Sequence, residues 1–100
     1  MRRGEVFIEA MEVLTLESFP PQFNLYVSGN LPTPCHELRA NVLPPDDQNR
    51  IMVDIYTVVD PEMMCIQVIE PFDQTIPLGP LDPGAYTVFV NGQQVGEISY

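Results

Sequence analysis

The clearest pattern of hydrophobic and polar positions lies near the C-terminal end of the chain. Residues 85–90 alternate with a period of two, which is typical of a strand with one buried face. The apolar face of this strand holds Tyr86, Val88 and Val90. Asn91 and Gly92 follow, and this dipeptide suits the positive φ angles of a tight hairpin turn. Residues 93–100 supply the returning strand, so the pattern predicts an antiparallel β domain.

The rest of the chain shows the same pattern of short strand candidates separated by turn residues. Seven strand candidates cover residues 5–17, 22–28, 35–43, 50–59, 64–70, 85–90 and 93–100. The proline-spaced residues 71–80 are expected to form an extended crossing, because proline cannot donate a ladder hydrogen bond. Short strands at this spacing, with no internal repeat, predict an all-β fold. We expect one immunoglobulin-like Greek-key β-sandwich domain over residues 1–100.

The first strand candidate has two interpretations. Glu5, Glu9 and Glu12 would share one face of a helix. However, residues 5–17 are rich in β-branched and aromatic side chains, and no helix cap precedes them. The composition therefore favours a strand with a β-bulge, with a helix as the alternative.

The charge balance excludes several classes of partner. The chain carries 14 acidic residues, four arginines and no lysine, for a net charge of −10. Nucleic acids and anionic lipids both require Lys and Arg at the contact, so neither is an expected partner. No apolar run approaches the roughly 20 residues of a membrane-spanning helix.

The beginning of the chain differs from a signal peptide. Arg2 and Arg3 are followed by Glu5 and Glu9, which interrupt any apolar stretch. The chain is either cytoplasmic or, as we prefer, a mature extracytoplasmic domain whose export signal lies outside this sequence.

Two cysteines, Cys35 and Cys65, stand thirty residues apart. With a single histidine in the chain, cysteine and histidine cannot complete a four-ligand zinc site. The two thiols are either buried as small apolar groups or joined in an oxidising compartment. A lone pair of cysteines in strand-like settings favours the disulfide. The absence of tryptophan excludes an antibody-type core.

The sequence offers no catalytic constellation. His36 directly follows Cys35, and neighbours on a strand point to opposite faces, so they cannot form a thiolate–imidazole pair. A pair between His36 and Cys65 requires that no disulfide forms. Asp46 and Asp47 have the composition of a calcium loop without its spaced ligands. We therefore expect no catalytic, cofactor-binding or metal-binding residues, and a protein that is not an enzyme.

Three residues near the C-terminus have predicted structural roles. Tyr86 follows a Pro-Gly turn and matches the tyrosine corner of Greek-key sandwiches, whose hydroxyl bonds the backbone across the corner. Asn91 and Gly92 are expected to form the hairpin turn. The remaining tyrosines are candidates for a contact surface because they combine apolar area with a polar tip. They are Tyr26, Tyr56 and Tyr100.

Several motifs together resemble a family of uncharacterised domains in exported or lipid-anchored bacterial proteins, especially of filamentous phototrophic (Chloroflexi-type) and related bacteria. The motifs are Glu-Ser-Phe-Pro at 17–20, Gly-Asn-Leu-Pro-Thr-Pro-Cys at 29–35, Met-Cys at 64–65, Glu-Pro-Phe at 70–72, Thr-Ile-Pro-Leu at 75–78, Gly-Ala-Tyr-Thr-Val at 84–88 and Val-Asn-Gly at 90–92. The resemblance implies an extracytoplasmic immunoglobulin-like domain with a bridge between Cys35 and Cys65. It implies no activity.

Two functions follow as expectations. The first is a non-catalytic interaction or structural module with a protein or cell-envelope partner. The alternative is a small inhibitor of a protease or other hydrolase. Its contact loop would be residues 31–35, where prolines make the backbone rigid and limit the entropy lost on docking. The candidate contact residues are Leu31, Pro32, Thr33 and Pro34.

Overall fold

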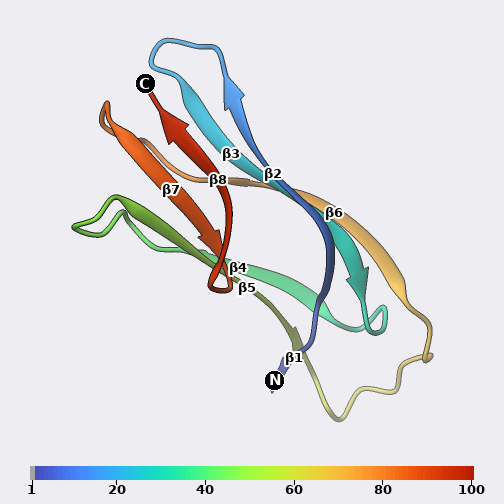
Figure 1. Ribbon diagram of the computed structural model, residues 1–100. Coiled ribbons are helices and arrows are strands. Elements are labelled where there is room, and N and C mark those ends of the chain that lie inside the picture. Colours follow the sequence, from blue (N-terminus) through green and yellow to red (C-terminus); the bar gives the residue numbers. More distant parts are fainter. Residues whose placement is uncertain (1) are drawn as a thin grey trace.

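The computed structural model describes residues 2–100, and these form eight strands and no helix (Figure 1). The strands are β1 (Arg2–Gly4), β2 (Phe7–Leu16), β3 (Gln22–Leu31), β4 (Glu37–Val42), β5 (Arg50–Val59), β6 (Glu70–Pro77), β7 (Ala85–Val90) and β8 (Gln93–Ser99). The predicted all-β class is confirmed. Within residues 2–100 there is no helix long and apolar enough to cross a membrane.

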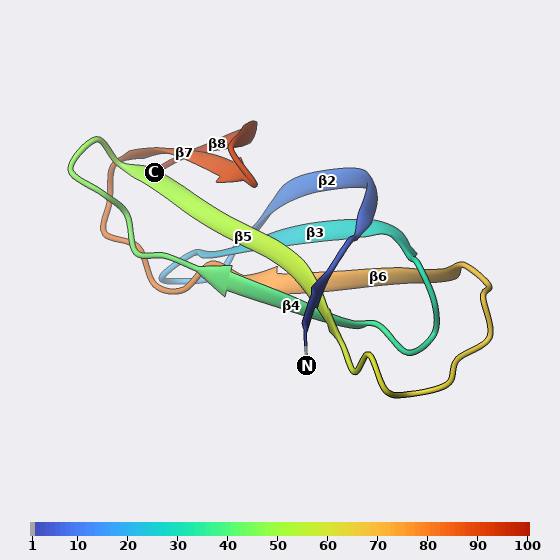
Figure 2. The ribbon, with the colours of Figure 1, turned by 90° about the horizontal axis from the view of Figure 1, so that it is seen from below.

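The strands form two sheets that face each other across a shared core (Figure 2). One sheet has the order β2-β3-β6. The other has the order β1-β5-β7-β8, with β4 paired to β5. The chain crosses between the sheets before β2, β4, β6 and β7, as expected of a sandwich whose connections are interleaved.

Strand β5 organises the larger sheet. Strand β4 pairs with one edge of β5 in antiparallel orientation, from Glu37 opposite Val58 to Val42 opposite Val53. The other edge of β5 is shared by β7 at its beginning and β1 at its end. Strand β7 runs parallel to β5, which differs from the purely antiparallel domain expected from the sequence. The reason is that the chain leaves this sheet through β6 and returns beside β5 in the same direction.

The core follows the alternation seen in the sequence. Every second residue of β3, β5 and β7 is buried, and these side chains pack between the two sheets. The most deeply buried apolar side chains are Leu25, Val27, Ile51, Ile55, Val88 and Val90. Each stabilises the fold by about 1.5–3 kcal/mol relative to an exposed position.

Strand β2 contains the predicted bulge, and the helical alternative for residues 5–17 is wrong. The register between β2 and β3 shifts between Ile8 and Ala10. Gly29 lies opposite the bulge, where an added Cβ would collide with the carbonyl oxygen of Phe7. The irregular pairing is therefore matched by a residue without a side chain.

The sequence-based prediction is wrong in the region of residues 64–77. Residues 64–69 of the strand expected over residues 64–70 are irregular backbone, and the expected crossing contains β6. Strand β6 tolerates Pro71 and Pro77 because it has a neighbour, β3, on one side only. An edge strand has backbone N–H groups that face away from its sheet, so their absence costs no ladder bond there.

Candidate interaction surface

Cys35 and Cys65 form a disulfide, with their Cα atoms 6.1 Å apart. This separation is within the limit of about 7 Å for a bridge without backbone movement. Neither cysteine lies in a strand, contrary to expectation. Cys35 belongs to the turn between β3 and β4, and Cys65 belongs to the irregular segment between β5 and β6. The bridge therefore fastens two loops at one end of the sandwich and does not cross the core.

The turn that carries Cys35 is held by Thr33 and His36. The Thr33 Oγ1 and His36 Nδ1 atoms lie 2.8 Å apart, and Thr33 Oγ1 also accepts from the Cys35 backbone N–H at 3.3 Å. The backbone N–H of His36 donates to the Thr33 carbonyl at 3.2 Å. The Thr33 residue is only 7% exposed. This network fixes the backbone on which the disulfide is anchored.

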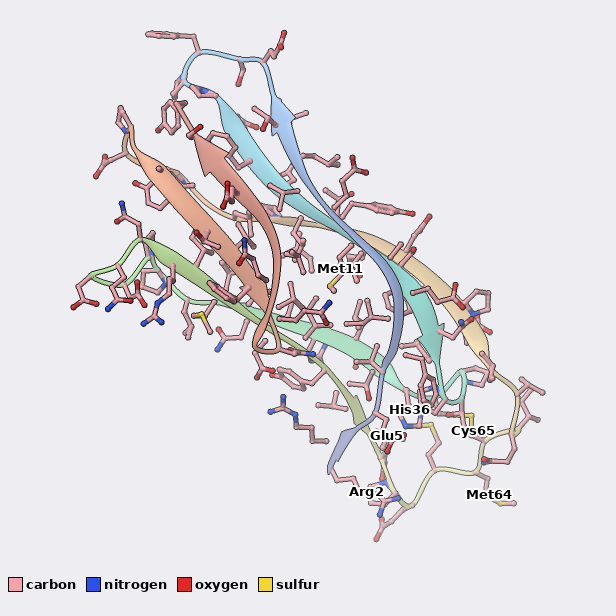
Figure 3. The ribbon with its side chains drawn as sticks, in the orientation of Figure 1. Arg2, Glu5, Met11, His36, Met64 and Cys65 are labelled. Carbon is pink, nitrogen blue, oxygen red and sulfur yellow. A yellow bond between two sulfur atoms is a disulfide. The ribbon has the colours of Figure 1, made fainter. Side chains whose placement is uncertain are left out.

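His36 packs against the N-terminal strand. A Cβ on Gly4 would lie 2.7 Å from His36 Cδ2 and 2.8 Å from Thr57 Oγ1, so the glycine permits this close approach. The Thr57 hydroxyl donates to the Glu5 carbonyl at 2.8 Å. Figure 3 shows His36 between Glu5 and the bridge at Cys65. The imidazole thus belongs to a packed junction, and both cysteine sulfurs that could accompany it are in the disulfide.

The residues of the predicted contact loop, 31–34, differ in how far they are buried. Leu31 and Thr33 are buried, Pro32 is half-buried and Pro34 is exposed. Rigid prolines flank a buried threonine, so Pro34 is the residue of this loop that a partner can reach most readily.

Residues 63–69, which we call the apolar segment, are the main exposed apolar feature of this end of the molecule. The Met64 side chain points away from the sandwich, whereas Cys65 is held toward it by the bridge (Figure 3). Met64 is 97% exposed and Ile66 is 68% exposed. The other exposed apolar side chains here are Met63, Val68 and Ile69. Contiguous exposed apolar surface of this kind marks interaction sites in soluble proteins.

Acidic residues lie on both sides of the apolar segment. Asp60 and Glu62 precede it in a turn, where Asp60 Oδ1 accepts from the Glu62 backbone N–H at 3.0 Å. Glu70 follows it as the first residue of β6. The segment is thus an apolar stretch with carboxylates at each end.

The acidic loop between β4 and β5 has an internal role. Asp46 accepts hydrogen bonds from the Gln48 and Arg50 backbone N–H groups and from Arg50 Nε. The hydrogen bond from the Arg50 backbone is the largest of the effects that lower the pKa of Asp46. Within residues 2–100, no group of three or more His, Cys, Asp or Glu side chains is arranged to hold a metal ion.

The three residues with predicted structural roles near the C-terminus, Tyr86, Asn91 and Gly92, lie in or beside turns. The Tyr86 hydroxyl donates to the Asp82 carbonyl at 2.8 Å. Asn91 and Gly92 both have positive φ, at 51° and 85°, in the turn between β7 and β8. In addition, the Asn91 side-chain amide bonds both backbone groups of Ile55 in β5. Sequence analysis missed this link, because it depends on the parallel placement of β7 beside β5.

Two of the predicted contact tyrosines have partners within the chain. Arg3 lies over the ring of Tyr56, with its Cζ 4.3 Å from the ring centroid. Tyr100 packs on Phe23, with ring centroids 5.3 Å apart. Their rings therefore contribute to the domain's own packing, and the apolar segment offers the more accessible surface.

These features define a disulfide-bridged β-sandwich with an exposed apolar segment beside the bridge. Residues 25–100 match the model of the ORF11 beta-sandwich domain family, and the chain belongs to this family. The family match confirms the β-sandwich part of the predicted resemblance.

The curated relatives come from Herpetosiphon aurantiacus. The "uncharacterized 10.2 kDa protein in HgiCIIM 5′ region" is 34% identical over 90 residues, which cover 86% of this chain and 92% of the relative. The corresponding proteins in the HgiBIM and HgiEIM 5′ regions are each 36% identical over 78 residues, covering 74% of this chain and 90% of each relative. No solved structure matches the chain.

Proposed function

We propose that this domain is a non-catalytic, extracytoplasmic module of the immunoglobulin-like kind that binds a protein or cell-envelope partner. The observation that carries the proposal is the exposed apolar segment, which the disulfide holds at one end of the sandwich. An apolar stretch of this size is costly to leave in water, and a bound partner would cover it.

The packing of the candidate nucleophiles supports a non-catalytic role. The two sulfurs are bonded to each other, and His36 is hydrogen-bonded to Thr33 and packed over Gly4. A side chain fixed in this way stabilises the junction of β1 with the turn. Cys35, Cys65 and His36 therefore have structural roles in the fold.

The disulfide supports an extracytoplasmic location. Structural disulfides persist in oxidising compartments and are rare where cellular thiols keep cysteines reduced. To test the location, cells that produce the full-length natural protein are quenched in acid and alkylated with a maleimide reagent. We expect both cysteines to be protected from alkylation. Two alkylated cysteines in freshly quenched cells would overturn the extracytoplasmic assignment.

Photo-cross-linking tests the binding role in the same cells. A benzophenone amino acid replaces Met64 in the apolar segment or, as the matched control, Phe19, which is fully exposed in the loop between β2 and β3. Figure 1 shows these two loops at opposite ends of the molecule. We expect one discrete partner from position 64 and none from position 19. Equal products from both positions would contradict the proposal.

The inhibitor hypothesis is the second candidate, and it is supported by the bracing of residues 31–35. The disulfide at Cys35 and the bond between Thr33 and His36 make this loop rigid before any partner binds. Because Thr33 is buried, the contact would fall on Pro34 and Pro32. Inhibition of one member of a protease panel that is lost in Pro34→Ala would favour this function over the module.

A further inference from the structure

The apolar segment presents backbone as well as side chains. Within residues 2–100 it takes part in neither sheet. Two hydrogen bonds involve its backbone: Met63 N–H donates to the Asp60 carbonyl, and the Cys65 carbonyl accepts from the Gln67 side chain. The following residues up to Ile69 are without regular structure. A chain with unpaired N–H and C=O groups and alternate apolar side chains has the properties of an unpaired β-strand.

The neighbouring strand is a poorer place for a partner to pair. Strand β6 directly follows the segment and has a free edge, but it carries Pro71 and Pro77. These two positions have the same parity, so both missing N–H groups fall on one side of the strand. Because β3 occupies the other side, the free edge of β6 lacks donors at both ends. Of these two neighbouring elements, the apolar segment is therefore the better place for strand addition.

The charges around the segment select the occupant. Asp60, Glu62 and Glu70 flank it, and no Lys, Arg or His follows Arg50 in the chain. Three of the four arginines are already ion-paired within the domain, Arg3 with Asp54, Arg39 with Glu37 and Arg50 with Asp46. Arg2, opposite Val59, is the remaining arginine near Asp60. This one arginine cannot balance three carboxylates, so their full neutralisation requires cations from outside the chain.

We propose that the occupant is an extended, lysine- or arginine-rich apolar strand of a partner protein, which pairs with the backbone of the apolar segment. This inference rests on the proposed binding role and specifies the partner's chemistry. A second copy of this chain is disfavoured because each copy carries a net charge of −10. An anionic membrane surface is disfavoured for the same reason.

The binding experiment uses the oxidised protein and capped octapeptides of alternating lysine and isoleucine. Control peptides have glutamate in place of lysine, or contain lysine alone. We expect the lysine–isoleucine peptide to bind and both controls to bind at least about tenfold more weakly, since charge and apolar contact both contribute. Amide hydrogen exchange of residues 64–69 should slow in the complex, as expected for strand pairing.

Matched variants separate local recognition from overall charge. The variant Asp60→Asn, Glu62→Gln, Glu70→Gln should weaken binding about tenfold. The control Glu12→Gln, Glu17→Gln, Glu97→Gln has the same net charge and exposed positions away from the segment, and it should change binding less than about twofold. The double variant Ile66→Ser, Val68→Ser should also weaken binding about tenfold, whereas Phe19→Ser should not. Asp60 is half-buried and the other replaced side chains are exposed, and circular dichroism checks that each variant keeps the fold.

Three results of the peptide experiment would overturn the inference: an equal loss of peptide binding in the two charge variants, equal binding of the glutamate peptide, or unchanged amide exchange of residues 64–69 in the complex. Two other results would show a different occupant. One is self-association in sedimentation that is abolished by Ile66→Ser and Val68→Ser, and the other is binding to phosphatidylcholine vesicles through these residues. If cross-linking from position 64 nevertheless captures a partner in cells, the binding role stands and only its cationic-strand chemistry is wrong.

Discussion

The side chain of Asn91 forms two hydrogen bonds with the backbone of Ile55 and so extends the ladder between β7 and β5 beyond the last residue of β7. The Ile55 N–H donates to Asn91 Oδ1 at 2.9 Å, and Asn91 Nδ2 donates to the Ile55 carbonyl at 3.1 Å. The Asn91 N–H also donates to the Val53 carbonyl at 2.9 Å. Asn91 therefore has two roles: it forms the hairpin turn together with Gly92, and it joins the C-terminal hairpin to β5.

Substitutions at Asn91 should separate these two roles. Asn91→Gly keeps the positive φ but loses both side-chain bonds, and should lower the free energy of unfolding by about 2 kcal/mol. Asn91→Ala also strains the left-handed backbone, and should lower it by roughly 1 kcal/mol more. Urea denaturation measures both values. Equal stability of the glycine variant and the parent would show that the Ile55 bonds contribute nothing.

Gly29→Ala should destabilise the fold by about 2 kcal/mol or more, because its Cβ would collide with the Phe7 carbonyl in the β2 bulge. Ser28→Ala is the control on the same strand, where the smaller side chain removes no hydrogen bond found in the structure and should cost less than about 1 kcal/mol. Thermal unfolding of the two variants checks the difference. Equal melting temperatures would contradict the assigned role of Gly29.

Removal of the disulfide by Cys35→Ser with Cys65→Ser should lower the free energy of unfolding by about 3–4 kcal/mol, from the entropy of a closed loop of this length. The two cysteines are 30 positions apart. The β circular dichroism spectrum should survive, because the bridge joins loops and the core strands remain packed. Collapse of the spectrum in the double variant would show that the bridge is required for folding.

The stability contributed by Asp46 should depend on pH. Hydrogen bonds to its carboxylate, first among them the one from the Arg50 N–H, lower its pKa in the folded state. A lowered folded pKa adds stability above the ordinary Asp pKa of about 3.9, and this contribution is lost as the pH falls through the folded value. Asp46→Asn should therefore reduce the fall in melting temperature below about pH 4 relative to the parent protein. Parallel curves for the two proteins would contradict the carboxylate's role.

The sequence predicted the parts of the fold whose signal is local. Alternation in β3, β5 and β7 is strong because one face of each strand is buried, and Asn91-Gly92 fixes its own turn. Strand β1 carries no such signal, since Arg2 and Arg3 are paired only through the end of β5. The parallel pairing of β5 with β7 is likewise a property of the connections between distant elements.

The candidate site was harder to predict, because a short apolar run in a sequence can form either a buried strand or an exposed irregular segment. Residues 64–70 have the composition of a buried strand, yet the structure leaves residues 64–69 outside both sheets. The proline-containing residues after them form the strand, because an edge position removes the penalty for proline. Apolar character near Ile66 could be found from the sequence, but its exposure could not. The exposure is a property of the three-dimensional structure, in which the bridge between Cys35 and Cys65 holds the segment at one end of the sandwich.

Hydrogen–deuterium exchange of the purified, oxidised domain tests the central claim most directly, since it asks whether the apolar segment is an unpaired and available strand. The amides of residues 64–69 should exchange at nearly the rate of an unstructured peptide, whereas those of β3 and β5 should be strongly protected. Strong protection of residues 64–69 in the free, monomeric domain would contradict the account, because the segment would then already be paired within the fold.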